Sequence, residues 1–105
     1  MTAYTGNTKT TTPTIQTATS TTVLAANPFR KLLIIQNASG AHIGIGLEGQ
    51  TLTGIAPTST NKCLNLTNSD NGNRLIFTNG FVPGGAITAY QTSGAPINTL
   101  VVIEG

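Results

Sequence analysis

Turn-forming residues interrupt this chain at short intervals, and that spacing limits its fold more than any other feature. Clusters of Gly, Asn, Pro and Ser recur every ~8–12 residues and separate short runs rich in β-branched residues. No stretch shows the apolar repeat of an amphipathic helix. The pattern predicts an all-β chain, a single antiparallel β-sandwich or jelly-roll-like barrel of about seven to eight short strands. The strongest turn signal, Asn71-Gly72, favours a type I′ hairpin between KCLNLT and RLIFT.

The clearest strand is the run KLLIIQN at residues 31–37. Leu32 and Ile34 fall on one face and Leu33 and Ile35 on the other, so this strand should be buried on both sides or pass between sheets. The core is expected at the alternating apolar positions of this and the other runs. We predict that it contains Leu32, Ile34, Ile43, Ile45, Leu64, Phe77, Ile87 and Val102.

Glycines occupy one face of the next run, HIGIGLEG at residues 42–49. Its strict alternation predicts a half-buried strand, in which Gly44 and Gly46 leave a flat outer strip that a neighbouring backbone or subunit could approach closely. The same glycines match the G-x-G-x-x-G pattern of dinucleotide sites. That site needs a helix directly after the glycines, and QTLTGIAP does not form one, so we interpret the pattern as a strand and a turn.

The first residues of the chain differ in composition from the rest. Residues 1–14, MTAYTGNTKTTTPT, are rich in Thr and lack the apolar content for a packed element. We therefore expect an extended N-terminal arm ahead of a β-sandwich domain at residues 15–105. This arm is either a frayed end or part of a partner-binding surface, with Tyr4 and Lys9 as its candidate contact residues.

Charged residues are scarce. They make up 8% of the chain and leave a net charge of +2, which is too weak for the clustered Lys and Arg that bind nucleic acid. The sequence has no run of ~20 apolar residues and no apolar leader at its start. We expect no membrane contact and a chain that stays in a cytoplasm or leaves it by lysis. The lone Cys63 should be a reduced thiol in or beside the core.

Side chains that carry catalysis are also few. The chain has one His, one Cys, one Asp and two Glu. Nothing in their spacing brings His42, Cys63 and Asp70 into a triad or pairs two carboxylates. No Cys or His stands at metal-ligand spacing from another. We predict that the protein is not an enzyme and uses no metal and no cofactor.

Two segments resemble a small β-domain of tailed-phage virion structural proteins. They are VLAANPFRKLLIIQNASGAHIGIGLEG at residues 23–49 and VPGGAITAYQTSGAPINTLVVIEG at residues 82–105, together about half of the chain. The resemblance implies a capsid decoration or cement protein on the capsid exterior of the virion, made in the host cytoplasm. It implies binding to the major capsid protein and stabilisation of the shell, as a homo-oligomer with a trimer favoured.

Exposed aromatic residues leave a second function open. Carbohydrate modules stack sugars on rows of exposed rings. Phe29, Phe81 and Tyr90 could share such a surface, although no stripe is visible in the sequence. A glycan- or receptor-binding module of a phage fibre or tail therefore stays an alternative to capsid decoration.

Arg30 and Lys31 stand directly before the most apolar run, although the chain has only five Lys and Arg in all. In one interpretation the guanidinium of Arg30 spans the rim of the fold and donates to loop carbonyls. In the other it pairs with an acidic shell or a neighbouring subunit. The candidate partner-binding residues are thus Tyr4, Lys9, Arg30, Gly44 and Gly46.

Overall fold

The structure, a computed structural model, describes residues 8–105 and contains only strands and loops in that range. Its eight strands are β1 (Lys9–Thr11), β2 (Thr21–Leu24), β3 (Leu33–Asn37), β4 (Ile43–Gly46), β5 (Leu64–Leu66), β6 (Arg74–Phe77), β7 (Ile87–Tyr90) and β8 (Leu100–Glu104). Within the described chain, no helix is long and apolar enough to cross a membrane.

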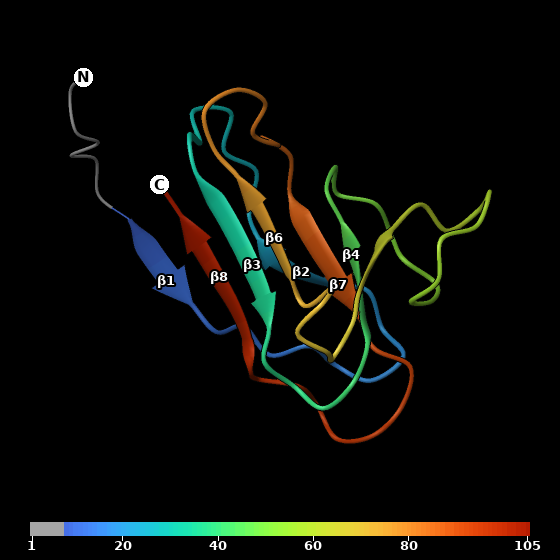
Figure 1. The fold of residues 1–105 in the computed structure, drawn as a ribbon. Coiled ribbons are helices and arrows are strands. Elements are labelled where there is room, and N and C mark those ends of the chain that lie inside the picture. The colour runs from blue at the N-terminus through green and yellow to red at the C-terminus, as the bar shows by residue number, and fades with distance from the viewer. Residues whose placement is uncertain (1–7) are drawn as a thin grey trace.

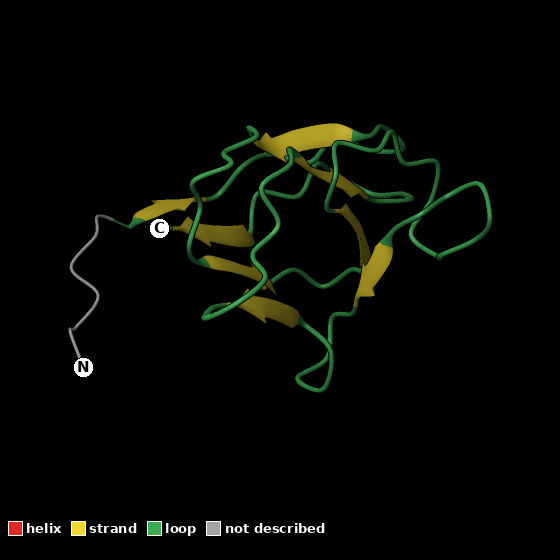
Figure 2. Ribbon diagram, turned by 90° about the horizontal axis from the view of Figure 1, so that it is seen from above, coloured by secondary structure: helices red, strands yellow, loops and turns green. Residues whose placement is uncertain are grey.

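The strands form two antiparallel sheets of four strands each. The first sheet has the order β1-β8-β3-β6 and faces the viewer in Figure 1, and the second has the order β2-β7-β4-β5. Seen from above in Figure 2, the strands surround a common interior. This arrangement confirms the predicted all-β fold and its sandwich architecture.

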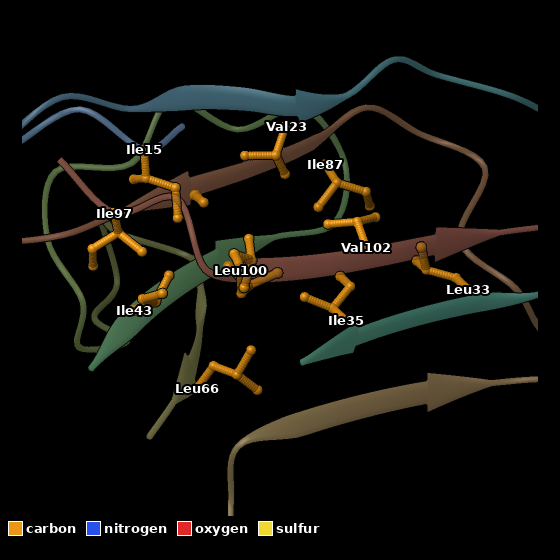
Figure 3. Close-up of a cluster of buried hydrophobic side chains, with 12 residues drawn as sticks. Ile15, Val23, Leu33, Ile35, Ile43, Leu66, Ile87, Ile97, Leu100 and Val102 are labelled. Carbon is orange, nitrogen blue, oxygen red and sulfur yellow. The ribbon is translucent and has the colours of Figure 1, made fainter. Parts of the chain in front are cut away.

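A single apolar core fills the space between the sheets (Figure 3). Strands of both sheets contribute to it, and the predicted core residues Ile43, Ile45, Ile87 and Val102 are each at most 1% exposed. Ile15, which precedes β2, closes one end of the core, where its backbone pairs with that of Ile97. The loops therefore contribute to the core as well as the strands.

The core face of β3 is the opposite of the predicted one. Leu33 and Ile35 are fully buried, whereas the predicted core residues Leu32, just before the strand, and Ile34, on the outer face of the first sheet, are only half-buried. The pairing with β8 places Ile35 opposite Val102, and directly opposite residues point to the same face of a sheet. Because β3 is apolar on both sides, its own alternation could not identify the inner face.

Two further core predictions are wrong or only partly met, and both concern strands at sheet edges. Leu64 is 41% exposed, whereas Leu66, two residues later, is 1% exposed and belongs to the core. Leu64 lies on β5, which pairs only with β4 at the edge of the second sheet. Phe77, on the edge strand β6, is half-buried and packs against the core from its margin. An edge strand has a neighbour on one side only, which leaves inward side chains such as Leu64 and Phe77 less covered, although Leu66 on β5 is fully buried.

The predicted type I′ hairpin at Asn71-Gly72 is wrong. β5 pairs with β4 in the second sheet and β6 pairs with β3 in the first, so residues 67–73 connect the two sheets. Neither Asn71 nor Gly72 has the positive φ that a type I′ turn requires. The dipeptide does form a turn, but the burial of the strands decides which sheet each one joins.

Part of the predicted N-terminal arm belongs to the first sheet. Lys9–Thr11 pair with Val102–Glu104 as strand β1, which corrects the expectation that residues 1–14 lack a packed element. Strand pairing satisfies backbone groups and does not require apolar side chains, so the low apolar content of this segment did not prevent it. Tyr4 lies outside the described residues.

Buried amide side chains connect the elements at the ends of the sheets. Asn37, at the end of β3 and 1% exposed, donates from Nδ2 to the carbonyls of Ala41 at 2.7 Å and Leu66 at 3.1 Å. Gln91, also 1% exposed, donates from Nε2 to the carbonyl of Ile15 at 2.9 Å. Each amide thus bonds to backbone carbonyls of two or more segments near the ends of the sheets, some of which, like that of Ile15, also accept a backbone amide.

The inverted face of β3 gives a direct test with two neighbouring substitutions. Ile35→Ala removes a fully buried side chain and should lower the free energy of unfolding by ~2–5 kcal/mol. Ile34→Ala removes a half-buried side chain of equal size and should lower it by less than half as much. Urea denaturation of both variants measures the difference, and equal losses would contradict the assigned face.

Candidate interaction surface

Arg30 lies at the centre of a buried polar cluster. Its Nε donates to Glu104 Oε2 at 2.8 Å, and the Arg30 side chain is fully buried while that of Glu104 is 17% exposed. Nη2 donates to the carbonyl of Ala25 at 2.9 Å, and Nη1 donates to the carbonyls of Pro83 and Gly85. This geometry agrees with the interpretation of Arg30 as a rim guanidinium that donates to loop carbonyls.

The cluster holds two loops together, one before β3 and one after β6. The amide of Asn27 donates to the carbonyl of Gly84 at 2.8 Å, and Asn27 Nδ2 donates to Glu104 Oε2 at 3.3 Å. The loops approach so closely that a Cβ on Gly84 would lie 3.1 Å from Pro28 Cα. Because backbone and side-chain bonds both cross this contact, the two loops form one rigid unit.

Each of these loops presents an exposed phenylalanine in an Asn-x-Phe sequence. Phe29 is 84% exposed, and its amide donates to Asn27 Oδ1 at 3.1 Å, which shapes the turn. Phe81 is 77% exposed and follows Asn79 and Gly80, whose φ angles are +50° and +150°. Asn and Gly adopt such φ values most readily. Asn27 thus shapes the turn that carries Phe29, and the positive φ angles of Asn79 and Gly80 shape the loop that carries Phe81.

A hollow of about 670 Å³ lies between these loops, where β3 begins and β6 ends. Its lining is mainly apolar, with polar groups from Lys31, Thr78 and Asn79. The apolar residues that line it are Pro28, Leu32, Phe81 and Val82. We call the hollow together with Phe29 and Phe81 the rim surface. Exposed apolar groups gathered around a concave site are typical of interaction sites.

No protein-family model, characterised protein or solved structure matches this chain. The chemistry of the rim surface therefore carries the functional argument.

Of the predicted partner-binding residues, Tyr4 lies outside the described range, and the structure either buries the others or places them away from the rim surface. Arg30 lines the hollow, but its donors bond within the chain, so it is not free to pair with an acidic partner. Lys9 is exposed at the far edge of the first sheet, on β1. Gly44 and Gly46 are buried in the second sheet. Tyr90, predicted as a possible stacking residue, is half-buried on β7 beside Gly44.

The glycine strip is covered by the chain's own loop and not by another subunit. A Cβ on Gly44 would lie 2.8 Å from the carbonyl oxygen of Gly54 and 3.0 Å from Ile55 Cα. At Gly46 it would lie 2.5 Å from Thr88 Oγ1. The close backbone approach that the sequence indicated does occur, and it buries β4 on both faces, so the expected half-buried strand is a fully buried one.

The covering loop is held in place by Asn61, which is 4% exposed. Its Nδ2 donates to the carbonyls of Gly54 at 3.0 Å and Ala56 at 2.9 Å, and its Oδ1 accepts from the amide of Thr53 at 2.8 Å. Leu52 is 2% exposed beneath the loop. A side-chain amide therefore organises this loop as Arg30 organises the loops of the rim surface.

The titratable residues outside the rim surface have separate local roles. The thiol of Cys63 is buried, as expected, and burial raises its pKa. His42 is exposed, and its Nδ1 accepts from the amide of Asn68 at 3.3 Å. Glu48 and Asp70 are exposed. Within residues 8–105 no group of three or more His, Cys, Asp or Glu side chains could hold a metal ion.

Removing the Arg30 side chain should destabilise the fold strongly. Arg30→Met leaves the Glu104 carboxylate without its cation, with only the Asn27 amide still donating to it, and removes the side-chain donor to the carbonyls of Ala25 and Pro83. Loss of one member of a buried pair typically lowers stability by ~3–5 kcal/mol. Lys31→Met, at the exposed next position, is the control and should change stability by less than about 0.5 kcal/mol. Similar urea midpoints for the two variants would contradict the buried role.

Alanine substitutions at two glycines test the contact between β4 and its covering loop. Gly44→Ala should destabilise by ~1–3 kcal/mol, because the new methyl group meets backbone atoms that are themselves held by Asn61. A Cβ on Gly40 meets nothing within 4 Å, so Gly40→Ala is the matched control and should be close to neutral. Thermal unfolding compares the two. A neutral Gly44→Ala would mean that the strip is open.

Proposed function

We propose that this chain is a phage virion structural protein that decorates the capsid shell and stabilises it by binding alone. The observation that carries the proposal is the rim surface, on which two phenylalanines are exposed on loops fixed by a buried guanidinium. Aromatic anchors on rigid supports are typical of binding sites, because little conformational freedom is lost on docking. The resemblance of residues 23–49 and 82–105 to tailed-phage virion proteins supports the same function.

The expected strength of one contact suits a repetitive lattice. Full burial of one phenylalanine contributes roughly 1.5–3 kcal/mol, so two rings together contribute roughly 3–6 kcal/mol before the entropy of association is counted. One copy alone would bind weakly. Copies that contact each other or bridge neighbouring shell subunits gain effective concentration, which raises the affinity without further contacts in the site.

The scarcity of charge supports dense placement of copies. Charged residues make up 8% of the chain, and the cation nearest the core is neutralised by Glu104. Copies of a highly charged protein would repel one another on a crowded shell, whereas a net charge of +2 produces little repulsion. The partner under this proposal is the major capsid protein.

A sedimentation experiment tests the proposal. Capsids that lack this protein, prepared from the phage that encodes it, are mixed with the purified chain and pelleted, and the temperature of shell rupture is recorded. The intact chain should cosediment and raise that temperature. Phe29→Ser with Phe81→Ser should weaken binding by about two orders of magnitude, since ~3 kcal/mol of apolar burial is lost.

Leu64→Ser is the matched control, because Leu64 is also an exposed apolar residue but lies on β5 at the edge of the second sheet. It should leave cosedimentation unchanged. If the intact chain does not cosediment, shell decoration is wrong. If the double variant binds as tightly as the intact chain, the rim surface is the wrong site.

Glycan binding by a fibre or tail module is the second candidate, and one observation favours it. The exposed ring of Phe81 lines a hollow that also carries Lys31, Thr78 and Asn79, which combines a stacking face with groups that bond sugar hydroxyls. Copy number in purified virions separates the two candidates, since hundreds of copies indicate decoration and a handful indicate a fibre or tail part. Binding to a glycan array that Phe81→Ser abolishes would favour the glycan module.

A further inference from the structure

We propose that Asn79 is a site of spontaneous deamidation, and that its conversion changes the charge of the hollow. Asn79-Gly80 lies in the loop after β6, and both residues are exposed. A Cβ placed on Gly80 would meet nothing within 4 Å, and within residues 8–105 its amide N–H donates to no backbone carbonyl. This inference does not depend on shell binding or glycan binding.

The chemistry needs only water and a free backbone amide. Hydroxide takes the proton of the Gly80 amide, whose nitrogen then attacks Cγ of Asn79 and forms an N–Cγ bond. The Cγ–Nδ2 bond breaks, and the leaving nitrogen takes a proton from water and departs as ammonia. Water then opens the resulting succinimide at either carbonyl and yields aspartate or isoaspartate. Glycine at the second position favours the attack, because it lacks a Cβ that would hinder the approach and rotates freely.

The chain contains a second Asn-Gly pair that serves as an internal comparison. Asn71 is also exposed, but the amide of Gly72 donates to the carbonyl of Ser69 at 3.2 Å. The carbonyl of Gly72 accepts from the amide of Thr67 at 2.9 Å, and a Cβ on Gly72 would lie 2.9 Å from Thr67 Oγ1. Attack on Asn71 therefore requires the turn to open first.

Conversion of Asn79 would alter the electrostatics of the rim surface. Asn79 and Lys31 both line the hollow, and Arg30 is already paired with Glu104. A carboxylate at position 79 would place a negative charge in the same hollow as the Lys31 ammonium. The hollow would change from a site with one free cation to an overall neutral one, and its preference for acidic ligands would fall.

Peptide mass spectrometry of the folded protein tests the proposal. The purified full chain is incubated in mildly alkaline buffer made with heavy-oxygen water, so that each deamidation event carries a label. Asn79 should convert about five times faster than Asn71, the factor that a net hydrogen-bond energy of about 1 kcal/mol imposes on the Gly72 amide. In urea-unfolded protein the two rates should become similar.

A substitution provides the control for the assignment. Asn79→Gln should remove the fast-converting site and leave the rate at Asn71 unchanged, because glutamine would have to close a larger ring. The proposal is overturned if Asn71 converts as fast as Asn79 in the folded chain. It is also overturned if Asn79 stays intact in the folded chain while it converts in urea.

Discussion

This fold is organised around one constraint: backbone carbonyl groups in the loops need hydrogen-bond donors once they are buried. Eight strands of three to five residues leave most of the described chain in loops, and a buried carbonyl without a donor destabilises a protein by about 1–3 kcal/mol. The donors come from Arg30, Asn37, Asn61 and Gln91, which are no more than 5% exposed and each donate to at least two backbone carbonyls. These side chains give the loops a fixed shape that short strands alone could not impose.

The binding proposal rests on the same constraint. Because Arg30 ties the loop before β3 to the loop after β6, the phenylalanines they carry are displayed on a stiff support. The same cluster uses the charge of Arg30 within the fold, so its partner is Glu104 and not an acidic shell. A guanidinium that looked like a contact residue in the sequence positions the contact residues instead, and Phe29 and Phe81 become the exposed elements of the rim surface.

The sequence predicted where strands lie better than which face of each strand is buried and which strand it pairs with. Alternation located β3 and β4 correctly, but β3 is apolar on both sides, and only its pairing with β8 shows that Ile35 and not Ile34 enters the core. Asn71-Gly72 indicated a turn and wrongly indicated a hairpin, because a turn signal is local while strand pairing depends on the burial of distant segments. For the rim surface, the repeated Asn-x-Phe tripeptide was the available signal, and it did not reveal that the two loops meet.

The sequence by itself determined the class of the fold. Frequent turn residues between β-branched runs leave no segment long enough for a helix, and they predict a two-sheet sandwich, as observed. It also indicated that a backbone could approach closely at Gly44, since a strand face of glycines leaves room for it. Only the tertiary structure decided what fills it, namely the backbone at Gly54 and not a neighbouring subunit. The physical reason is that local sequence patterns restrict φ, ψ and burial only along one segment. The group that covers a surface or pairs with a buried charge comes from a segment far away in the chain, as Glu104 does for Arg30.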